Sequence, residues 1–146
     1  MKQIFTLMLI ASFTSAYSQF SMGMHIGASN KNMIAGLQSQ YQFRNRFTVG
    51  VNMTAHPDNS NPVFFQSRFG YTIGNPEGFS AQPYTGYSYG IQNLEQKNYG
   101  GHFTGGVQLR YQLTDIALIY TDINVPSPHY LMFSVGLAGK IPHRDD

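Results

Sequence analysis

Residues 46–55 read RFTVGVNMTA, and their side chains alternate between two chemical types. Phe47, Val49, Val51, Met53 and Ala55 fall on one side, whereas threonine, glycine and asparagine occupy the positions between them. Successive side chains of a β-strand point to opposite faces. The stretch therefore predicts a strand with one apolar and one polar face.

The segment just before it, residues 33–43, has the same character. Gln38, Gln40 and Gln42 fall on one face, and mostly apolar residues fall on the other. Only Arg44 and Asn45 separate this segment from the next. A connection this tight predicts that the two strands form an antiparallel hairpin.

Two-residue alternation continues along the rest of the chain, in segments of about ten residues separated by clusters of glycine, proline, asparagine, aspartate and serine. The expected strands cover residues 20–28, 33–43, 46–55, 63–73, 79–91, 99–113, 116–125 and 130–141. Pro83 interrupts the fifth of them, and both faces of the seventh are largely apolar, so the bounds of these two stay open. After residue 18 no run of eighteen apolar residues occurs, which argues against a transmembrane helix.

The first residues have the character of a secretory signal. Lys2 supplies a positive end, residues 4–13 form a short apolar run, and Ala16 and Ser18 provide small residues at a cleavage site before Gln19. The alternative is a retained N-terminal helix or anchor, but about ten apolar residues are too few to span a hydrocarbon core of ~30 Å. We therefore expect a signal peptide at 1–18 and one β-barrel domain at 19–146.

Composition limits the classes of function. Charged residues make up 11% of the chain, with nine basic and seven acidic side chains. Nucleic acid is therefore not an expected partner. Aromatic residues at 14% argue against disorder. The chain has no cysteine, which excludes both a disulfide framework and a lipidated N-terminal cysteine.

Sequence periodicity alone does not say whether the apolar face meets protein or lipid. The polar face carries amide and guanidinium groups that would be costly in a dry protein core. We expect these groups to form a polar network in the lumen of a membrane barrel, with members Gln38, Gln40, Asn52, Gln66, Arg68, Gln108, Arg110 and Asp122. A filled lumen of this kind is favoured over an anion-attracting pore, because an eight-stranded barrel is only wide enough for its own side chains.

Aromatic residues gather beside three short connections, at 44–45, 74–78 and 114–115. Aromatic rings favour the level of the lipid headgroups, where an apolar ring body and a polar edge are both accommodated. The sequence thus predicts an aromatic girdle near one end of the barrel, formed by Tyr41, Phe43, Phe47, Phe69, Tyr71 and Tyr111. The connections at 29–32, 56–62, 92–98 and 126–129 would then lie at the opposite, outward end.

Taken together, the signal, the alternation, the strand number and the turn pattern make the chain similar to the small eight-stranded outer-membrane β-barrel proteins. This resemblance covers the whole region after residue 18 and rests on no specific motif. It implies an all-β, antiparallel, up-and-down transmembrane β-barrel in the cell outer membrane. Membrane lipid is the implied partner, with other envelope proteins as a second class.

The expected function is non-enzymatic, with a structural, interaction or small-porin-like role and no cofactor. One alternative is a soluble periplasmic or secreted β-barrel or sandwich that binds a small apolar ligand. Another is a lipid-modifying barrel enzyme that uses His56 or Ser60, near Asp58. Metal binding is not expected, because the histidines at 25, 56, 102, 129 and 143 lack ligand-like spacing.

Overall fold

The computed structural model describes residues 19–57, 62–91 and 98–141, and it consists of antiparallel β-strands joined by short turns. The expected signal segment at 1–18 lies outside the described residues. The strands are β1 (Gln19–Ser29), β2 (Met33–Gln42), β3 (Phe47–Ala55), β4 (Val63–Tyr71), β5 (Ile73–Gly74), β6 (Phe79–Ile91), β7 (Asn98–Thr114), β8 (Ala117–Ser127) and β9 (Tyr130–Ile141).

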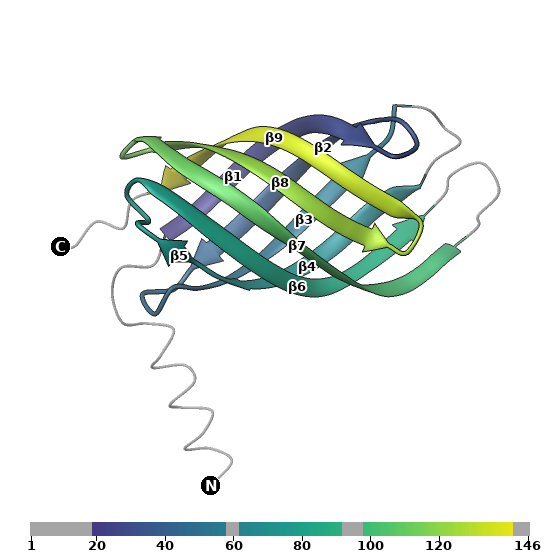
Figure 1. The fold of residues 1–146 in the computed structure, drawn as a ribbon, viewed down its shortest axis with the longest axis horizontal. Coiled ribbons are helices and arrows are strands. Elements are labelled where there is room, and N and C mark those ends of the chain that lie inside the picture. Colours follow the sequence, from purple (N-terminus) through teal and green to yellow (C-terminus); the bar gives the residue numbers. More distant parts are fainter. Residues whose placement is uncertain (1–18, 58–61, 92–97, 142–146) are drawn as a thin grey trace, which may run out of the picture.

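The strands close into a barrel (Figure 1). Each strand pairs with its neighbour in the chain, and the first strand, β1, also pairs with the last, β9, from Phe20 opposite Ile141 to Ser29 opposite Met132. β4 pairs directly with β6, and the two-residue β5 continues the line of β4. Counting β4 and β5 as one interrupted strand, the barrel has eight strands. This closed up-and-down topology confirms the fold class expected from the sequence.

The break between β4 and β5 has a physical cause in Pro83. The pairing with β6 stops at Gly70 of β4 and resumes at Ile73 of β5, so the gap lies beside Pro83, which has no backbone N–H to donate. Thr72, which separates β4 from β5, donates its N–H to the carbonyl of Arg46 on the β3 side. Proline therefore interrupts the ladder to β4 without ending β6, whose pairing with β7 continues through Pro83 opposite Val107.

Polar residues set the tight turns. Ser29 Oγ accepts the N–H groups of Lys31 and Asn32 at 3.1 and 3.0 Å. Asn45 Oδ1 accepts the N–H of Phe47 at 3.3 Å, and Asn75 Oδ1 accepts that of Glu77 at 3.1 Å. These side chains replace backbone partners at the points where the chain reverses. Because the resulting turns are short, they fix the register of the hairpins.

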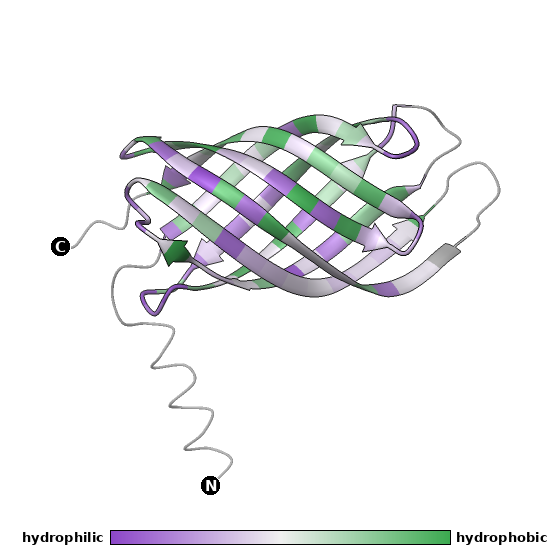
Figure 2. Ribbon diagram, viewed as in Figure 1, coloured by the Kyte–Doolittle hydropathy of each residue, from purple (hydrophilic) through white to green (hydrophobic). Residues whose placement is uncertain are grey.

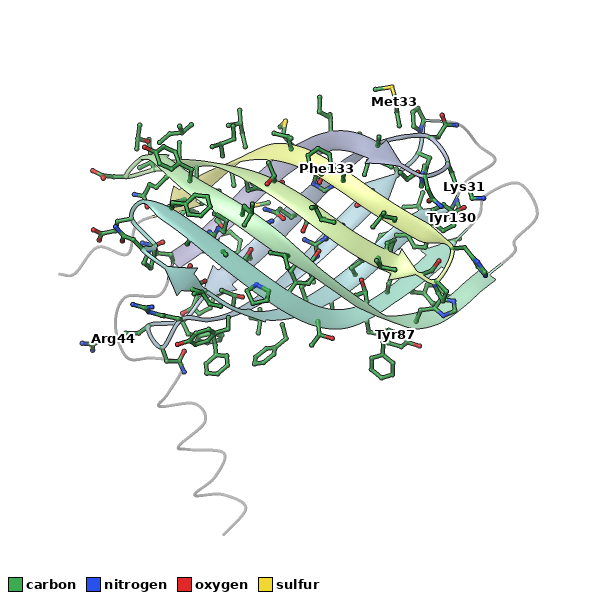
Figure 3. All side chains as sticks on the ribbon, viewed as in Figure 1. Lys31, Met33, Arg44, Tyr87, Tyr130 and Phe133 are labelled. Carbon is green, nitrogen blue, oxygen red and sulfur yellow. The ribbon has the colours of Figure 1, made fainter. Side chains whose placement is uncertain are left out.

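Apolar and polar residues alternate along the strands (Figure 2). The exposed large side chains are apolar, whereas most of the buried ones are polar, so the barrel has an apolar exterior and a mostly polar interior. Val51 is 61% exposed on the outside, while its neighbour Asn52 is 3% exposed on the inside. Met33 and Tyr87 likewise point away from the barrel (Figure 3). Across the described ranges, none of the chain forms a helix long and apolar enough to cross a membrane.

The barrel has two chemically different ends. The inner end, as we name it, carries the turns that follow β2, β5 and β7, together with the start of β1 and the end of β9. The outer end carries the turns that follow β1 and β8. Arg44 extends beyond the inner end and Lys31 lies at the outer end (Figure 3).

Candidate functional site: the filled lumen and the two ends

An ion pair lies near the centre of the lumen. Arg68 Nη2 is 2.9 Å from Asp122 Oδ2, and the two side chains are 9% and 2% exposed. Tyr84 Oη donates to Asp122 Oδ1 at 2.8 Å, and Asn124 Nδ2 donates to Oδ2 at 3.0 Å. The Arg68 guanidinium carbon also lies 4.4 Å from the centre of the Tyr84 ring. Three strands, β4, β6 and β8, are therefore joined through a single carboxylate.

Amide side chains extend this network. Gln66 Nε2 lies 3.2 Å from Asn124 Oδ1 and 3.3 Å from Thr104 Oγ1, and the amides of Gln66 and Asn52 are 2.8 Å apart. Across the barrel, Gln108 Nε2 donates to Gln38 Oε1 at 3.0 Å. The bonds of Gln66 to Thr104 and Asn124 and that of Gln108 to Gln38 cross the interior, whereas the Asn52–Gln66 contact joins the adjacent strands β3 and β4. Amide groups therefore serve as hydrogen-bond partners for one another inside the barrel.

Towards the inner end the lumen is cationic. Arg110 Nη1 donates to the amide oxygens of Gln82 and Gln42, at 3.1 and 3.2 Å. Lys140 Nζ donates to Gln112 Oε1. Arg110 and Lys140 are 7% and 6% exposed, and within the described part of the chain neither has a carboxylate partner. The structure thus places Arg110 in a separate layer from Asp122.

Gln40 completes this inner layer. Its Nε2 donates to Gln82 Oε1 at 2.7 Å, and Gln82 Nε2 donates to Thr48 Oγ1 at 2.7 Å. Gln82 therefore bridges Gln40, Thr48 and Arg110. All eight residues that the sequence placed in the lumen lie inside the barrel, although they divide between a central layer and this inner layer.

The outer end of the lumen is apolar. Ile34, Phe64, Tyr130 and Met132 form a cluster in which no member is more than 5% exposed. The rings of Phe64 and Tyr130 are 5.0 Å apart in an edge-to-face arrangement. These buried side chains occupy the outer end of the lumen.

His56 lies against the same cluster. Its Nδ1 is 3.1 Å from the Pro62 carbonyl oxygen, and its Nε2 is 3.1 Å from Ser29 Oγ. Its ring centroid is 5.7 Å from that of Tyr130. His56 is 7% exposed. These contacts hold the turn after β1 against the start of β4, which gives this histidine a structural role at the outer end.

Sequence reasoning missed several interior residues. Tyr84 and Gln82 were hidden because Pro83 stands between them and disturbs the segment. His25 and Tyr120 also face inward: Tyr120 Oη lies 3.3 Å from His25 Nδ1, and His25 Nε2 lies 3.3 Å from Thr54 Oγ1. For His25 the available signal was its position on the small and polar face of a regular strand, whereas Tyr120 lies in the segment whose two faces are both largely apolar.

The aromatic residues singled out in the sequence lie on the outside, beside the inner-end turns. Tyr41 and Phe43 pack with ring centroids 4.9 Å apart. Phe47 stacks on Phe69 at 5.5 Å and meets Tyr71 edge-on at 5.2 Å. Tyr111 is 52% exposed and pairs in register with Phe79 of β6. These rings form a band over β2, β3, β4, β6 and β7.

The residues considered for metal binding and catalysis are only partly described. They contain no group of three or more histidine, cysteine, aspartate or glutamate side chains able to hold a metal ion. Of the candidate enzyme residues, His56 is described, whereas Asp58 and Ser60 lie outside the described residues.

Comparison with known proteins gives the fold but no family. No family model matches the chain, and no curated protein matches it either. Among solved structures, the N-terminal β-barrel domain of Pseudomonas aeruginosa OprF superposes with a TM-score of 0.70 at 12% identity, covering 84% of this chain and 97% of that one. A de novo designed transmembrane β-barrel gives 0.66 at 14% identity, with 87% and 98% covered.

A third neighbour is Ail, the attachment invasion locus protein of Yersinia pestis. It superposes with a TM-score of 0.56 at 12% identity, covering 85% of this chain and 97% of that one. At sequence identities this low, the similarity supports a shared fold and nothing more. The chain therefore has the fold of the small eight-stranded outer-membrane β-barrels, as the sequence predicted.

Proposed function

We propose that this chain is a non-enzymatic outer-membrane β-barrel that serves as a closed membrane anchor, with its interactions at the two ends. The single observation that carries this proposal is the combination of a lipid-compatible exterior with a filled interior. Each half of that observation argues against a different alternative.

The exterior argues against a soluble barrel or sandwich. Such a protein would bury its apolar face, yet Val51, Leu109 and Phe133 are 61%, 41% and 50% exposed on the outside of the closed barrel. Large apolar side chains cover the outside of every long strand, far beyond the patches that soluble monomers expose. Acyl chains are the environment that such a surface fits, because the sheet closes on itself through β1 and β9 and so presents no open edge to lipid.

The interior argues against a small porin. In the central Arg68–Asp122 pair, the guanidinium also donates to Gln66, and the carboxylate also accepts from Tyr84 and Asn124. The cluster of Ile34, Phe64, Tyr130 and Met132 fills the outer end. An ion would have to displace both. We therefore favour anchoring or interaction over conduction, and we place any recognition at the rims and turns.

Membrane fractionation and gel mobility test the proposal. A folded barrel is expected in the outer-membrane fraction, should need detergent for extraction, and should run at a different position before and after boiling. In a planar bilayer it should show no steady conductance. A monomer that stays soluble without detergent would refute the membrane placement, whereas a steady open channel would refute the closed lumen alone.

A further inference from the structure

The turn between β2 and β3 combines charge and aromatic rings in an unusual way. Residues 43–47 read Phe-Arg-Asn-Arg-Phe, so two arginines stand between two rings of the aromatic band. Both Arg44 and Arg46 are exposed, and Arg44 extends beyond the inner end of the barrel (Figure 3). The flanking rings are fixed by Tyr41 on one side and by Tyr71 on the other.

The backbone of this turn is held in a single shape. Phe43 donates its N–H to the Phe47 carbonyl at 2.8 Å, and Arg46 donates its own to the Phe43 carbonyl at 3.0 Å. The Arg46 carbonyl accepts the N–H of Thr72 at 2.9 Å, which links the turn to the segment between β4 and β5. The two guanidinium groups therefore start from a rigid base.

Arg46 occupies this position against its conformational preference. Its φ is 70°, in the left-handed region, and it is the non-glycine residue with positive φ within the described ranges. Asparagine or glycine adopts this conformation more readily than arginine. A residue kept in an unfavourable conformation indicates that the side chain serves a purpose beyond the turn itself.

The charges of the inner end favour an anionic partner. Arg44, Arg46, Arg110 and Lys140 lie at this end with Glu77 and Asp115, which leaves an excess of two positive charges among the described residues (4 − 2). Arg46 has no carboxylate partner in the described part of the chain. At the outer end, the described turns carry only Lys31 as a charged residue.

We propose that residues 43–47 form a clamp for the phosphate of an anionic phospholipid, with Arg44 and Arg46 binding the headgroup and Phe43 and Phe47 seated among its acyl chains. Guanidinium groups suit this task because their planar donors match phosphate oxygens. The aromatic band places the clamp at headgroup depth. The inference rests on the proposed membrane placement and adds a preferred lipid and a preferred end.

The test uses native mass spectrometry of the refolded full chain in mixed micelles of phosphatidylglycerol and phosphatidylcholine. The readout is the ratio of bound phosphatidylglycerol to bound phosphatidylcholine. Each arginine near an anionic headgroup should contribute roughly a fivefold preference, which weakens at high salt. We expect the wild-type protein to select phosphatidylglycerol and R46N to lose about fivefold of that selection.

R46N is the informative variant because asparagine tolerates the left-handed backbone, so the barrel should fold at least as well as wild type. K31Q is the matched control, since it removes one exposed positive charge from an outer-end turn that lacks flanking aromatic residues. It should leave the lipid ratio unchanged. An equal loss in K31Q and R46N would overturn the proposal, because it would indicate attraction by net charge alone.

Two other outcomes are decisive. If R46N inserts and retains wild-type selectivity, the clamp is wrong while the membrane placement stands. If the wild-type chain forms no heat-modifiable barrel in phospholipid vesicles, the proposed function itself fails. Tight binding of inorganic phosphate by the lipid-free barrel, abolished in R46N, would reassign the site from a lipid headgroup to a free anion.

Discussion

Replacing Asp122 with alanine should be the most damaging single change in the lumen. The carboxylate neutralises Arg68 at 2.9 Å and accepts from Tyr84 and Asn124 at 2.8 and 3.0 Å. Alanine would leave a buried guanidinium without its charge partner and two polar groups without an acceptor. Removing one member of a buried ion pair typically costs about 3–5 kcal/mol, and we expect a loss in that range for D122A.

A double variant separates the pair from its surroundings. In R68M/D122L both charges are replaced by apolar side chains of similar length, so no buried charge is left unpaired. Such replacements are often close to neutral. We expect the double variant to lie within about 1–2 kcal/mol of wild type, the remaining loss coming from Tyr84 and Asn124, whose polar groups keep no partner at this position.

The free energy of unfolding can be measured by urea titration of the barrel in vesicles. The folded fraction is read from gel mobility without boiling, which suits a chain that has no tryptophan. Refolding and unfolding limbs must coincide for the comparison to hold. A loss below about 1 kcal/mol for D122A would refute the central role of the carboxylate. Equal losses in the single and double variants would refute the assignment of the cost to an unpaired charge.

The remaining predictions concern the exterior and the packing of strands. V51R should cost roughly 2–4 kcal/mol in a lipid bilayer, because Val51 faces outward in the middle of β3. Placing the same charge at Phe47, which is on the same face of β3 but in the aromatic band at its inner end, should cost about 1 kcal/mol or less, and equal costs in urea titrations would contradict the depth assignment. G86A should destabilise the barrel by about 1–3 kcal/mol, since an added Cβ would lie 1.8 Å from the Ser67 carbonyl oxygen. G139A has open space, with its nearest contact 4.0 Å away, and should be within about 0.5 kcal/mol of wild type by the same titration.

The sequence predicted the barrel well because its strands carry a strict two-residue period. In β3 the alternation of Val49 and Val51 with Gly50 and Asn52 assigned every side chain to the face it occupies. The hairpins followed from short polar connections such as Arg44-Asn45. Local rules sufficed here, since an up-and-down barrel pairs each strand with its neighbour in the chain.

The arrangement within the lumen was less predictable. Which cation meets Asp122 depends on strand tilt and stagger around the whole barrel, and these are properties of closure that no single segment encodes. Arg68 and Arg110 lie on the same polar face of the sequence pattern, yet only Arg68 contacts Asp122. The apolar cluster of Phe64 and Met132 was also unforeseen, because each residue breaks the polar pattern near the outer end of its strand.

These layers explain why the two ends of the barrel should differ in function. The apolar outer cluster contains no described charge, so the interior charges concentrate at the centre and at the inner end. Arg68 is neutralised by Asp122, whereas Arg110 and Lys140 meet only amide oxygens, and their positive potential adds to that of Arg44 and Arg46. Among the described residues, a charge distribution of this kind favours an anionic leaflet at the inner end more strongly than at the outer end. The polarity that fills the lumen therefore also supplies a reason for the barrel to prefer one orientation in an asymmetric membrane.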